Sequence, residues 1–230
     1  MALFLLAVGG SYGTSQAQED YRMFEAKTPQ LDYAYAKGVS GHIAGELLPG
    51  QLVMAGGCNF PDRPALEGGA KRYYSEIYLA DYLDAMYAAC EAKASELDMG
   101  WKLVGHLPQP TAYAAFQQYF SQLIVAGGQS EAGELRDAYI IQLSDSLDVE
   151  IIPLPSLPEP RSGMASALIG DVLYLIGGRV NGKLSNTALS LDLRRPEAGW
   201  REETPYPHNP FLKLVAATNK GERGTYSYVP

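Results

Sequence analysis

The sequence predicts an all-β protein built from repeated four-stranded antiparallel sheets, and three observations support this prediction. The 24 glycines, 15 prolines and 16 tyrosines among 230 residues favour short strands joined by tight turns over a helical bundle. An apolar strand that ends in a Gly-Gly pair occurs three times. Each pair is followed by a further strand that opens with an acidic or amide residue.

The repeats can be followed strand by strand. The first strands, rich in small residues as expected where strands crowd near an axis, are 39–45, 112–116 and 163–168. The second strands, which carry the Gly-Gly pairs, are 52–57, 123–128 and 173–178. The third strands open at Glu76, Asp137 and Asn186. The fourth strand contains Trp101 in the first repeat and Trp200 in the third, and in the second repeat it spans 149–154 without a tryptophan.

Four antiparallel strands per repeat, followed by Pro-rich links, are typical of the blades of a β-propeller. Glycine suits the end of the second strand because the chain leaves it in a conformation that a β-carbon opposes. We therefore expect three blades and the start of a fourth, at 37–110, 111–160, 161–210 and 211–230. Propellers close into rings of typically 4 to 8 blades, so this chain is expected to be part of a larger ring.

The first repeat carries two additions. About ten extra residues follow its Gly-Gly pair, because 19 residues separate Gly57 from Glu76, against 9 and 8 in the other repeats. Between its third and fourth strands, apolar residues recur at helical spacing, which predicts an amphipathic helix over 81–99.

The N-terminus and the composition restrict location and partners. Residues 1–18 resemble a secretory signal peptide without its basic start, which predicts a periplasmic or secreted protein, and the apolar run is too short to span a membrane. The net charge of −8 without a basic stripe argues against nucleic acid. Cys58 and Cys90 lack the spacing of a zinc or redox motif, so we expect ordinary thiols.

One face of the blades collects the loops that join second to third strands and the links between blades. Binding residues are expected there, because loops on a rigid scaffold usually carry function. Guanidinium groups suit carboxylates, and aromatic faces suit sugar rings. The rim contains the following polar and aromatic residues: Asn59, Phe60, Arg63, Lys71, Arg72, Tyr113, Glu131, Glu134, Arg136, Arg161 and Arg179.

Four segments carry a more specific signal: GVSGHIAG at 38–45, MAGGCNFP at 54–61, KRYYSEI at 71–77 and PTAY at 110–113. Through them the sequence resembles the cyclically permuted mutarotases, Kelch-repeat propellers related to N-acetylneuraminate epimerase (sialic acid mutarotase). The resemblance spans roughly residues 37–206. The Gly-Gly pairs and later tryptophans are shared by many Kelch proteins, whereas the long loop after Asn59-Phe60-Pro61 is more specific.

This resemblance implies a six-bladed propeller, of which this chain would be half, and an isomerase that interconverts the anomers of N-acetylneuraminate without metal or cofactor. A base takes the anomeric hydroxyl proton while an acid protonates the ring oxygen. The family's essential acid and arginine belong to a blade expected beyond the end of this chain, so the catalytic residues are not identified, and Glu131 is one candidate for proton transfer. We expect Arg63 and Arg161 to contact the anion, and Asn59, Phe60 and Tyr113 to contact the sugar.

Other functions stay open. The chain can be a non-enzymatic Kelch module that binds a protein or glycan through the same rim, since fold alone does not fix function. A copper oxidase is disfavoured, because His42, His106 and His208 show no ligand-like spacing. If the ring is incomplete, a second half-propeller chain is the expected partner, since an open half leaves strand edges and core exposed.

Overall fold

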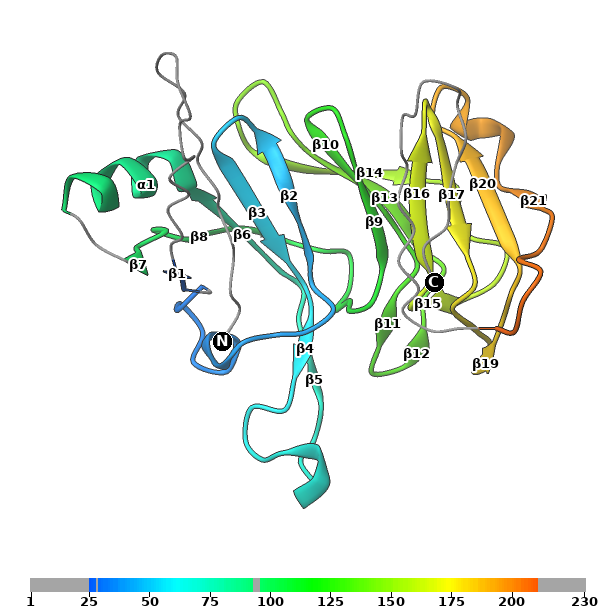
Figure 1. Ribbon diagram of the computed structural model, residues 1–230, viewed down its shortest axis with the longest axis horizontal. Coiled ribbons are helices and arrows are strands. Elements are labelled where there is room, and N and C mark those ends of the chain that lie inside the picture. Colours follow the sequence, from blue (N-terminus) through cyan, green and yellow to red (C-terminus); the bar gives the residue numbers. More distant parts are fainter. Residues whose placement is uncertain (1–24, 28, 93–95, 211–230) are drawn as a thin grey trace, which may run out of the picture.

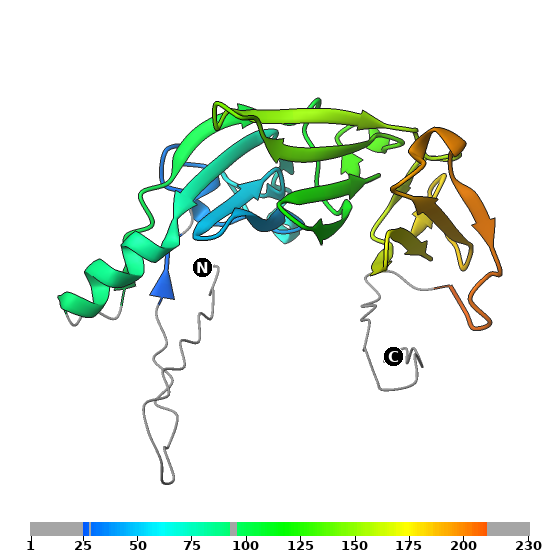
Figure 2. The same cartoon turned by 90° about the horizontal axis from the view of Figure 1, so that it is seen from above.

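The computed structural model describes residues 25–27, 29–92 and 96–210. Three four-stranded antiparallel sheets follow one another in an arc (Figures 1 and 2). The first sheet contains β2 (Ile43–Leu48), β3 (Gln51–Ala55), β6 (Glu76–Asp81) and β8 (Lys102–His106). The second contains β9 (Ala115–Tyr119), β10 (Gln122–Ala126), β13 (Ala138–Leu143) and β14 (Val149–Leu154). The third contains β16 (Ala165–Ile169), β17 (Val172–Ile176), β20 (Ala188–Asp192) and β21 (Arg201–Glu203).

The strands of each sheet pair in chain order, from β2, β9 or β16 outward to β8, β14 or β21. Neighbouring sheets meet at their first strands, where β9 lies against both β2 and β16. Glutamines tie these strands across the junctions: the Gln118 amide donates to the Glu46 carbonyl oxygen at 2.7 Å, and the Gln117 amide donates to Ser166 Oγ at 3.0 Å. The predicted all-β repeat architecture is confirmed.

Apart from the glutamines that open β3 and β10, the second strands are apolar, because both of their faces are covered. In β10, Leu123 and Val125 pack into the core between the first and second sheets, whereas Ile124 and Ala126 pack into the core between the second and third. Successive residues of a strand point to opposite faces, so one strand supplies both cores. Each core is therefore built by strands from two consecutive repeats.

The outer side of the first sheet is covered by the protein's own chain. Helix α1 (Tyr82–Glu91) follows β6 and packs Met86 and Ala89 beside the short parallel pair of β1 (Glu25–Ala26) and β7 (Glu96–Leu97). The predicted helix over 81–99 is correct in place but too long. Its apolar periodicity continues because Leu97 in β7 enters the same apolar cluster as the helix.

Short hairpins extend the second and third strands at one end of the sheets (Figure 1). They are β4 (Cys58–Asn59) with β5 (Arg72–Tyr73), β11 (Gln129–Ser130) with β12 (Gly133–Glu134), and β18 (Arg179–Val180) with β19 (Lys183–Leu184), the last joined by β15 (Arg161–Ser162). We call the end of the sheets that carries these hairpins the hairpin end.

The short 3-10 helices are η1 (Tyr35–Lys37), η2 (Ala65–Glu67) and η3 (Pro196–Ala198).

Two expectations concern segments outside the described residues: the signal peptide at 1–18 and the partial blade at 211–230. Among the described helices, none is long and apolar enough to cross a membrane.

Candidate functional site

The hairpin end is held together by the same backbone hydrogen bonds at both sheet junctions. The Gly57 amide donates to the Thr111 carbonyl oxygen at 2.7 Å, and the Gly128 amide donates to the Arg161 carbonyl oxygen at 2.8 Å. Thus the second glycine of the first and second pairs bonds to the chain that opens the next sheet. The repeated bonds make Thr111 and Arg161 equivalent positions in successive sheets.

Two residues further on, the chain turns through a positive φ in every sheet. The residue is Gly41 in the first sheet (φ 66°), Tyr113 in the second (φ 55°) and Gly163 in the third (φ 61°). The Tyr113 amide donates to the Gly41 carbonyl oxygen at 2.8 Å, and its own carbonyl accepts from the Gly163 amide at 2.9 Å. Tyr113 therefore joins all three sheets in a conformation that disfavours a side chain.

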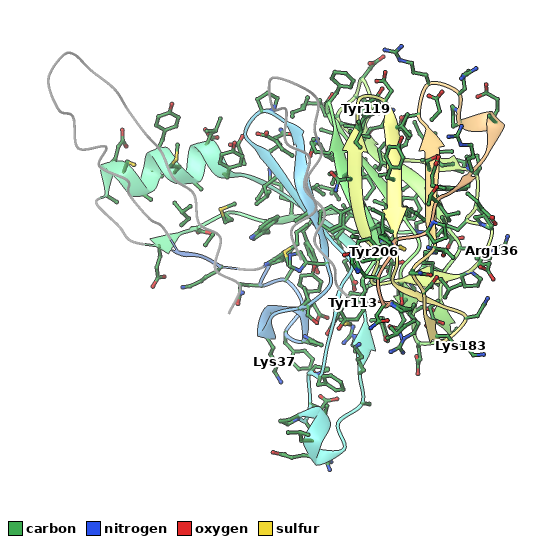
Figure 3. The ribbon with its side chains drawn as sticks, turned by 45° about the vertical axis from the view of Figure 1, so that its right-hand side comes forward. Lys37, Tyr113, Tyr119, Arg136, Lys183 and Tyr206 are labelled. Carbon is green, nitrogen blue, oxygen red and sulfur yellow. The ribbon has the colours of Figure 1, made fainter. Side chains whose placement is uncertain are left out.

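The Tyr113 side chain lies at the hairpin end, whereas Tyr119 lies at the opposite end of the second sheet (Figure 3). Its ring passes over Gly41, where an added β-carbon would come within 2.4 Å of Tyr113 Cδ1. Its hydroxyl oxygen accepts from Lys71 Nζ at 3.3 Å and from the buried Cys58 thiol at 3.3 Å, and lies 3.2 Å from Ser40 Oγ. We call these four residues, Ser40, Cys58, Lys71 and Tyr113, the Tyr113 cluster.

Lys71 is the cation of this cluster. Its ammonium lies over the ring of Tyr73 at 5.0 Å from the centroid and over that of Tyr113 at 4.6 Å, so both aromatic faces stabilise its charge. Partial burial lowers the pKa of Lys71, but its contacts with Tyr113, Cys58 and Tyr73 outweigh burial and raise it overall. Among the described residues, no carboxylate lies within 4.0 Å of Nζ.

Arg161 lies at the hairpin end but its guanidinium faces the protein. Nη1 donates to the carbonyl oxygens of Gly177 at 3.3 Å and Thr187 at 3.2 Å, and Nη2 donates to Thr187 Oγ1 at 2.8 Å. The residue is only 2 % exposed, and this burial lowers its pKa, with Glu159 opposing the shift. In this geometry Arg161 braces the third sheet, and its expected contact with an anion stays a prediction.

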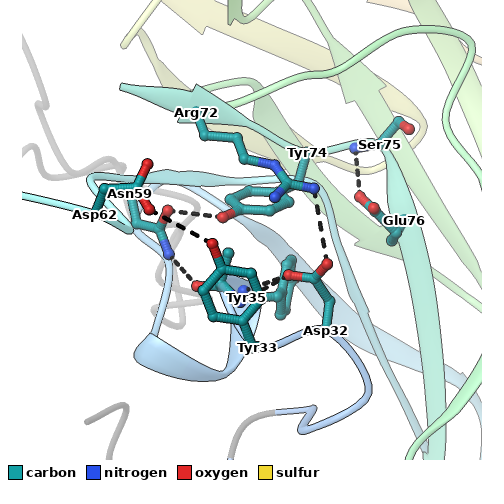
Figure 4. A network of polar contacts seen from close by, with 10 residues as sticks. Asp32, Tyr33, Tyr35, Asn59, Asp62, Arg72, Tyr74, Ser75 and Glu76 are labelled. Carbon is teal, nitrogen blue, oxygen red and sulfur yellow. Dashed lines mark hydrogen bonds and ion pairs between the residues drawn. The ribbon is translucent and has the colours of Figure 1, made fainter. Parts of the chain in front are cut away.

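Asn59 is also bonded within the protein (Figure 4). Its amide nitrogen donates to the Ala34 carbonyl oxygen at 2.6 Å and the Gly38 carbonyl oxygen at 2.9 Å, and its Oδ1 accepts from the Tyr74 hydroxyl at 2.8 Å. Asp32 accepts from the amides of Ala34 and Tyr35 in the same network. Asn59 therefore fastens residues 32–38 to the first sheet, and its expected sugar contact is untested.

Phe60 and Arg63 lie on the loop between β4 and β5, which projects beyond the other hairpins (Figure 1). Phe60 is 38 % exposed, and the Arg63 side chain is exposed. The Lys37 ammonium donates to the Pro61 carbonyl oxygen at the base of the loop, and the Tyr33 hydroxyl donates to Asp62 at 3.4 Å. The exposed part of this loop can reach a bound molecule, and the loop ends at Lys71 of the Tyr113 cluster, directly before β5.

The remaining rim residues lie on the second and third hairpins. Glu131 is exposed in the turn between β11 and β12, and its side chain forms no hydrogen bond or ion pair with other described residues. Glu134 lies 4.0 Å from Arg179, and Arg136 donates to the Leu157 carbonyl oxygen at 2.8 Å. Within the described ranges, no three His, Cys, Asp or Glu residues are grouped to hold a metal ion.

The structure thus brings together a set that the sequence placed only in part. Tyr113 was expected to contact sugar and Lys71 was placed on the rim, but nothing in the sequence joins them to Ser40 and Cys58. Lys71 and Tyr113 are 42 residues apart. The available signal was the repeat itself, in which Tyr113 occupies a position that is glycine in the other two repeats.

The chain is similar to known proteins at the level of fold. A family profile described as the Kelch motif matches residues 160–197. The structure of YjhT is similar with a TM-score of 0.53 and 14% sequence identity, and the match covers 75% of this chain and 54% of that one. The chain therefore spans about half the length of YjhT. A search of curated proteins yields no significant sequence match. With the three repeated sheets, these likenesses show an all-β fold of the Kelch-type β-propeller class.

Proposed function

We propose that this chain carries the substrate-binding rim of a mutarotase that interconverts the anomers of N-acetylneuraminate. The single observation that carries the proposal is the Tyr113 cluster, in which an unfavourable backbone conformation presents a tyrosine hydroxyl and a lysine ammonium at the hairpin end. Strained residues persist where the surrounding structure enforces them, and they gather at functional sites. The sequence resemblance to cyclically permuted mutarotases supplies the substrate class.

The cluster supports the chemistry of anomer exchange. Ring opening moves one proton from the anomeric hydroxyl to a base and another from an acid to the ring oxygen, so it needs hydroxyl-type donors and acceptors. The Tyr113 hydroxyl can donate to or accept from a sugar oxygen. We further propose an exported location and, as a partner, a second chain that completes the ring.

A second function is favoured by one observation: among the described residues, Lys71 has no carboxylate beside it that could exchange protons with a substrate. A rim that lacks a general base can bind a glycan or a protein without catalysis. This alternative predicts binding with no change in the rate of anomer exchange.

The test follows the anomer signals of freshly dissolved N-acetylneuraminic acid by proton NMR, with and without the protein. The mutarotase proposal predicts that equilibration accelerates in proportion to protein concentration, and that heat-denatured protein has no effect. Unchanged equilibration together with saturation transfer from protein to sugar would favour the binding module. Absence of both effects would contradict both functions.

A further inference from the structure

We infer that Lys71 and Tyr113 form a carboxylate-binding site for an acidic sugar, at the junction of the first and second sheets. The inference rests on the proposed function for the identity of the sugar, and it assigns the anion contact to Lys71 in place of Arg63 or Arg161. Three features of the described residues lead to it: a cation without a carboxylate partner, a strained tyrosine beside it, and the positions of the two arginines.

The cation is the first feature. Lys71 is half-buried, and its charge is met by two aromatic faces and a phenolic oxygen but by no carboxylate among the described residues. Its contacts with Tyr113, Cys58 and Tyr73 outweigh burial and raise its pKa, so the ammonium keeps its charge at neutral pH. Every ion pair recorded in the described part of the chain uses another basic residue. A carboxylate supplied by a ligand would complete the site.

The second feature is the Tyr113 hydroxyl beside Lys71. Its oxygen accepts from Lys71 Nζ at 3.3 Å and lies within hydrogen-bond distance of Cys58 Sγ and Ser40 Oγ. A tyrosine hydroxyl both accepts and donates, so a carboxylate that accepts from Lys71 with one oxygen can accept from this hydroxyl with the other by taking the place of Ser40. Hydrogen bonds between charged donors and carboxylates are among the strongest in proteins. Ser40, whose Oγ lies 3.2 Å from the hydroxyl and is exposed, can contact the sugar beside the carboxylate.

The third feature concerns the arginines. The Arg161 guanidinium is buried and donates to two carbonyl oxygens and one hydroxyl of the third sheet, so an anion would have to displace these bonds. Arg63 is exposed on the projecting loop between β4 and β5, outside the Tyr113 cluster. Lys71 lies in that cluster, where its ammonium already contacts the Tyr113 hydroxyl.

The experiment measures binding of the methyl glycoside of N-acetylneuraminate, which cannot exchange anomers, by isothermal titration calorimetry. The expected result is at least about tenfold weaker binding to Lys71→Met, since a desolvated charge-assisted contact is lost. Tyr113→Phe, which keeps the ring, is expected to weaken binding severalfold. Lys183→Met, on the exposed β18–β19 hairpin, is the matched control and is expected to bind like the original chain.

The methyl ester of the same glycoside isolates the carboxylate. The original chain should bind the ester about as weakly as Lys71→Met binds the acid, and Lys71→Met should not distinguish ester from acid. Equal binding of the acid by Lys71→Met and by the original chain would overturn the inference, as would an original chain that binds neither compound. If Lys71→Met unfolds, Tyr113→Phe with acid and ester provides the same comparison.

The outcome is separable from that of the proposed function. Lys71-dependent binding of the locked glycoside without accelerated anomer exchange would support the carboxylate site and contradict the mutarotase. Accelerated exchange together with binding that does not depend on Lys71 would support the mutarotase and contradict the carboxylate site.

Discussion

The turn that opens the second sheet and the turns that open the first and third share one backbone conformation but differ in one side chain. Gly41 and Gly163 take positive φ values without cost, whereas Tyr113 takes its positive φ at a cost of about 1–2 kcal/mol. The repeated hydrogen bonds at the sheet junctions impose the conformation in all three places. The difference teaches that the fold explains the conformation but not the tyrosine, which therefore requires a separate reason.

The glycine pairs also adopt positive φ values, but there a side chain has no space. A β-carbon on Gly127 would lie 2.4 Å from the Arg161 carbonyl oxygen and 2.8 Å from Met164 Cε, in a conformation with φ 63°. The Tyr113 side chain instead lies at the hairpin end among polar groups (Figure 3). A residue with a side chain can thus adopt a positive φ where the side chain has space, whereas only glycine fits where the next sheet approaches.

We expect the largest loss of stability from Gly127→Ala. Backbone strain and overpacking against the third sheet should together lower the free energy of unfolding by about 3 kcal/mol. Gly133→Ala serves as the matched control, because that residue also has a positive φ (124°) but no atom within 4 Å of an added β-carbon. Urea denaturation of both variants checks the prediction. Equal loss in both would show that φ alone, without the approach of the next sheet, determines the cost.

The next effect separates the two arginines that the sequence placed together as anion contacts. Arg161→Met should lower the free energy of unfolding by about 2 kcal/mol, because it leaves the Gly177 and Thr187 carbonyl oxygens without this donor. Arg63→Met, on an exposed loop, should change it by less than about 0.5 kcal/mol. Thermal and urea unfolding of the pair measure the difference. If Arg161→Met leaves the free energy of unfolding unchanged, Arg161 does not brace the third sheet.

The strain at Tyr113 can be measured by two substitutions at the same residue. Tyr113→Gly and Tyr113→Ala both remove the ring and its contacts, but only alanine keeps a β-carbon at φ 55°. The glycine variant should therefore be more stable than the alanine variant by about 1 kcal/mol, the reverse of the order in a helix or strand. Chemical denaturation gives both values. An alanine variant as stable as the glycine variant would mean that the turn relaxes and stores no strain.

The sequence predicted the elements that depend on local patterns. Apolar runs that end in Gly-Gly gave the second strands, and the direction of the strands gave the common end of the three hairpins. The helix was predicted too long because β7 contributes Leu97 to the cluster that α1 packs against, and apolar spacing does not distinguish a helical residue from a strand residue there.

The site was less predictable for two physical reasons. A guanidinium can donate to a carbonyl oxygen as well as to a carboxylate, so the residue type of Arg161 did not reveal which of the two it meets. The contact between Lys71 and Tyr113 depends on how the β4–β5 hairpin lies over the start of the second sheet, which no local pattern records. Comparison of equivalent residues across the repeats is what identifies Tyr113.

The smallest expected effect concerns His42, which follows Gly41 and occupies the position of Ala114 and Met164 in the other sheets. Burial lowers the pKa of His42 from its usual 6.5. The unfolded chain therefore binds a proton more readily than the folded one, so stability is present above pH 6.5 and is lost as pH falls from there toward the folded pKa. His42→Met introduces the residue type that the third sheet has at this position. This variant should lose less stability than the original chain between about pH 7.5 and about pH 5.5, as measured by urea denaturation. An unchanged slope would place the proton-linked loss elsewhere and leave the three turns alike except at Tyr113.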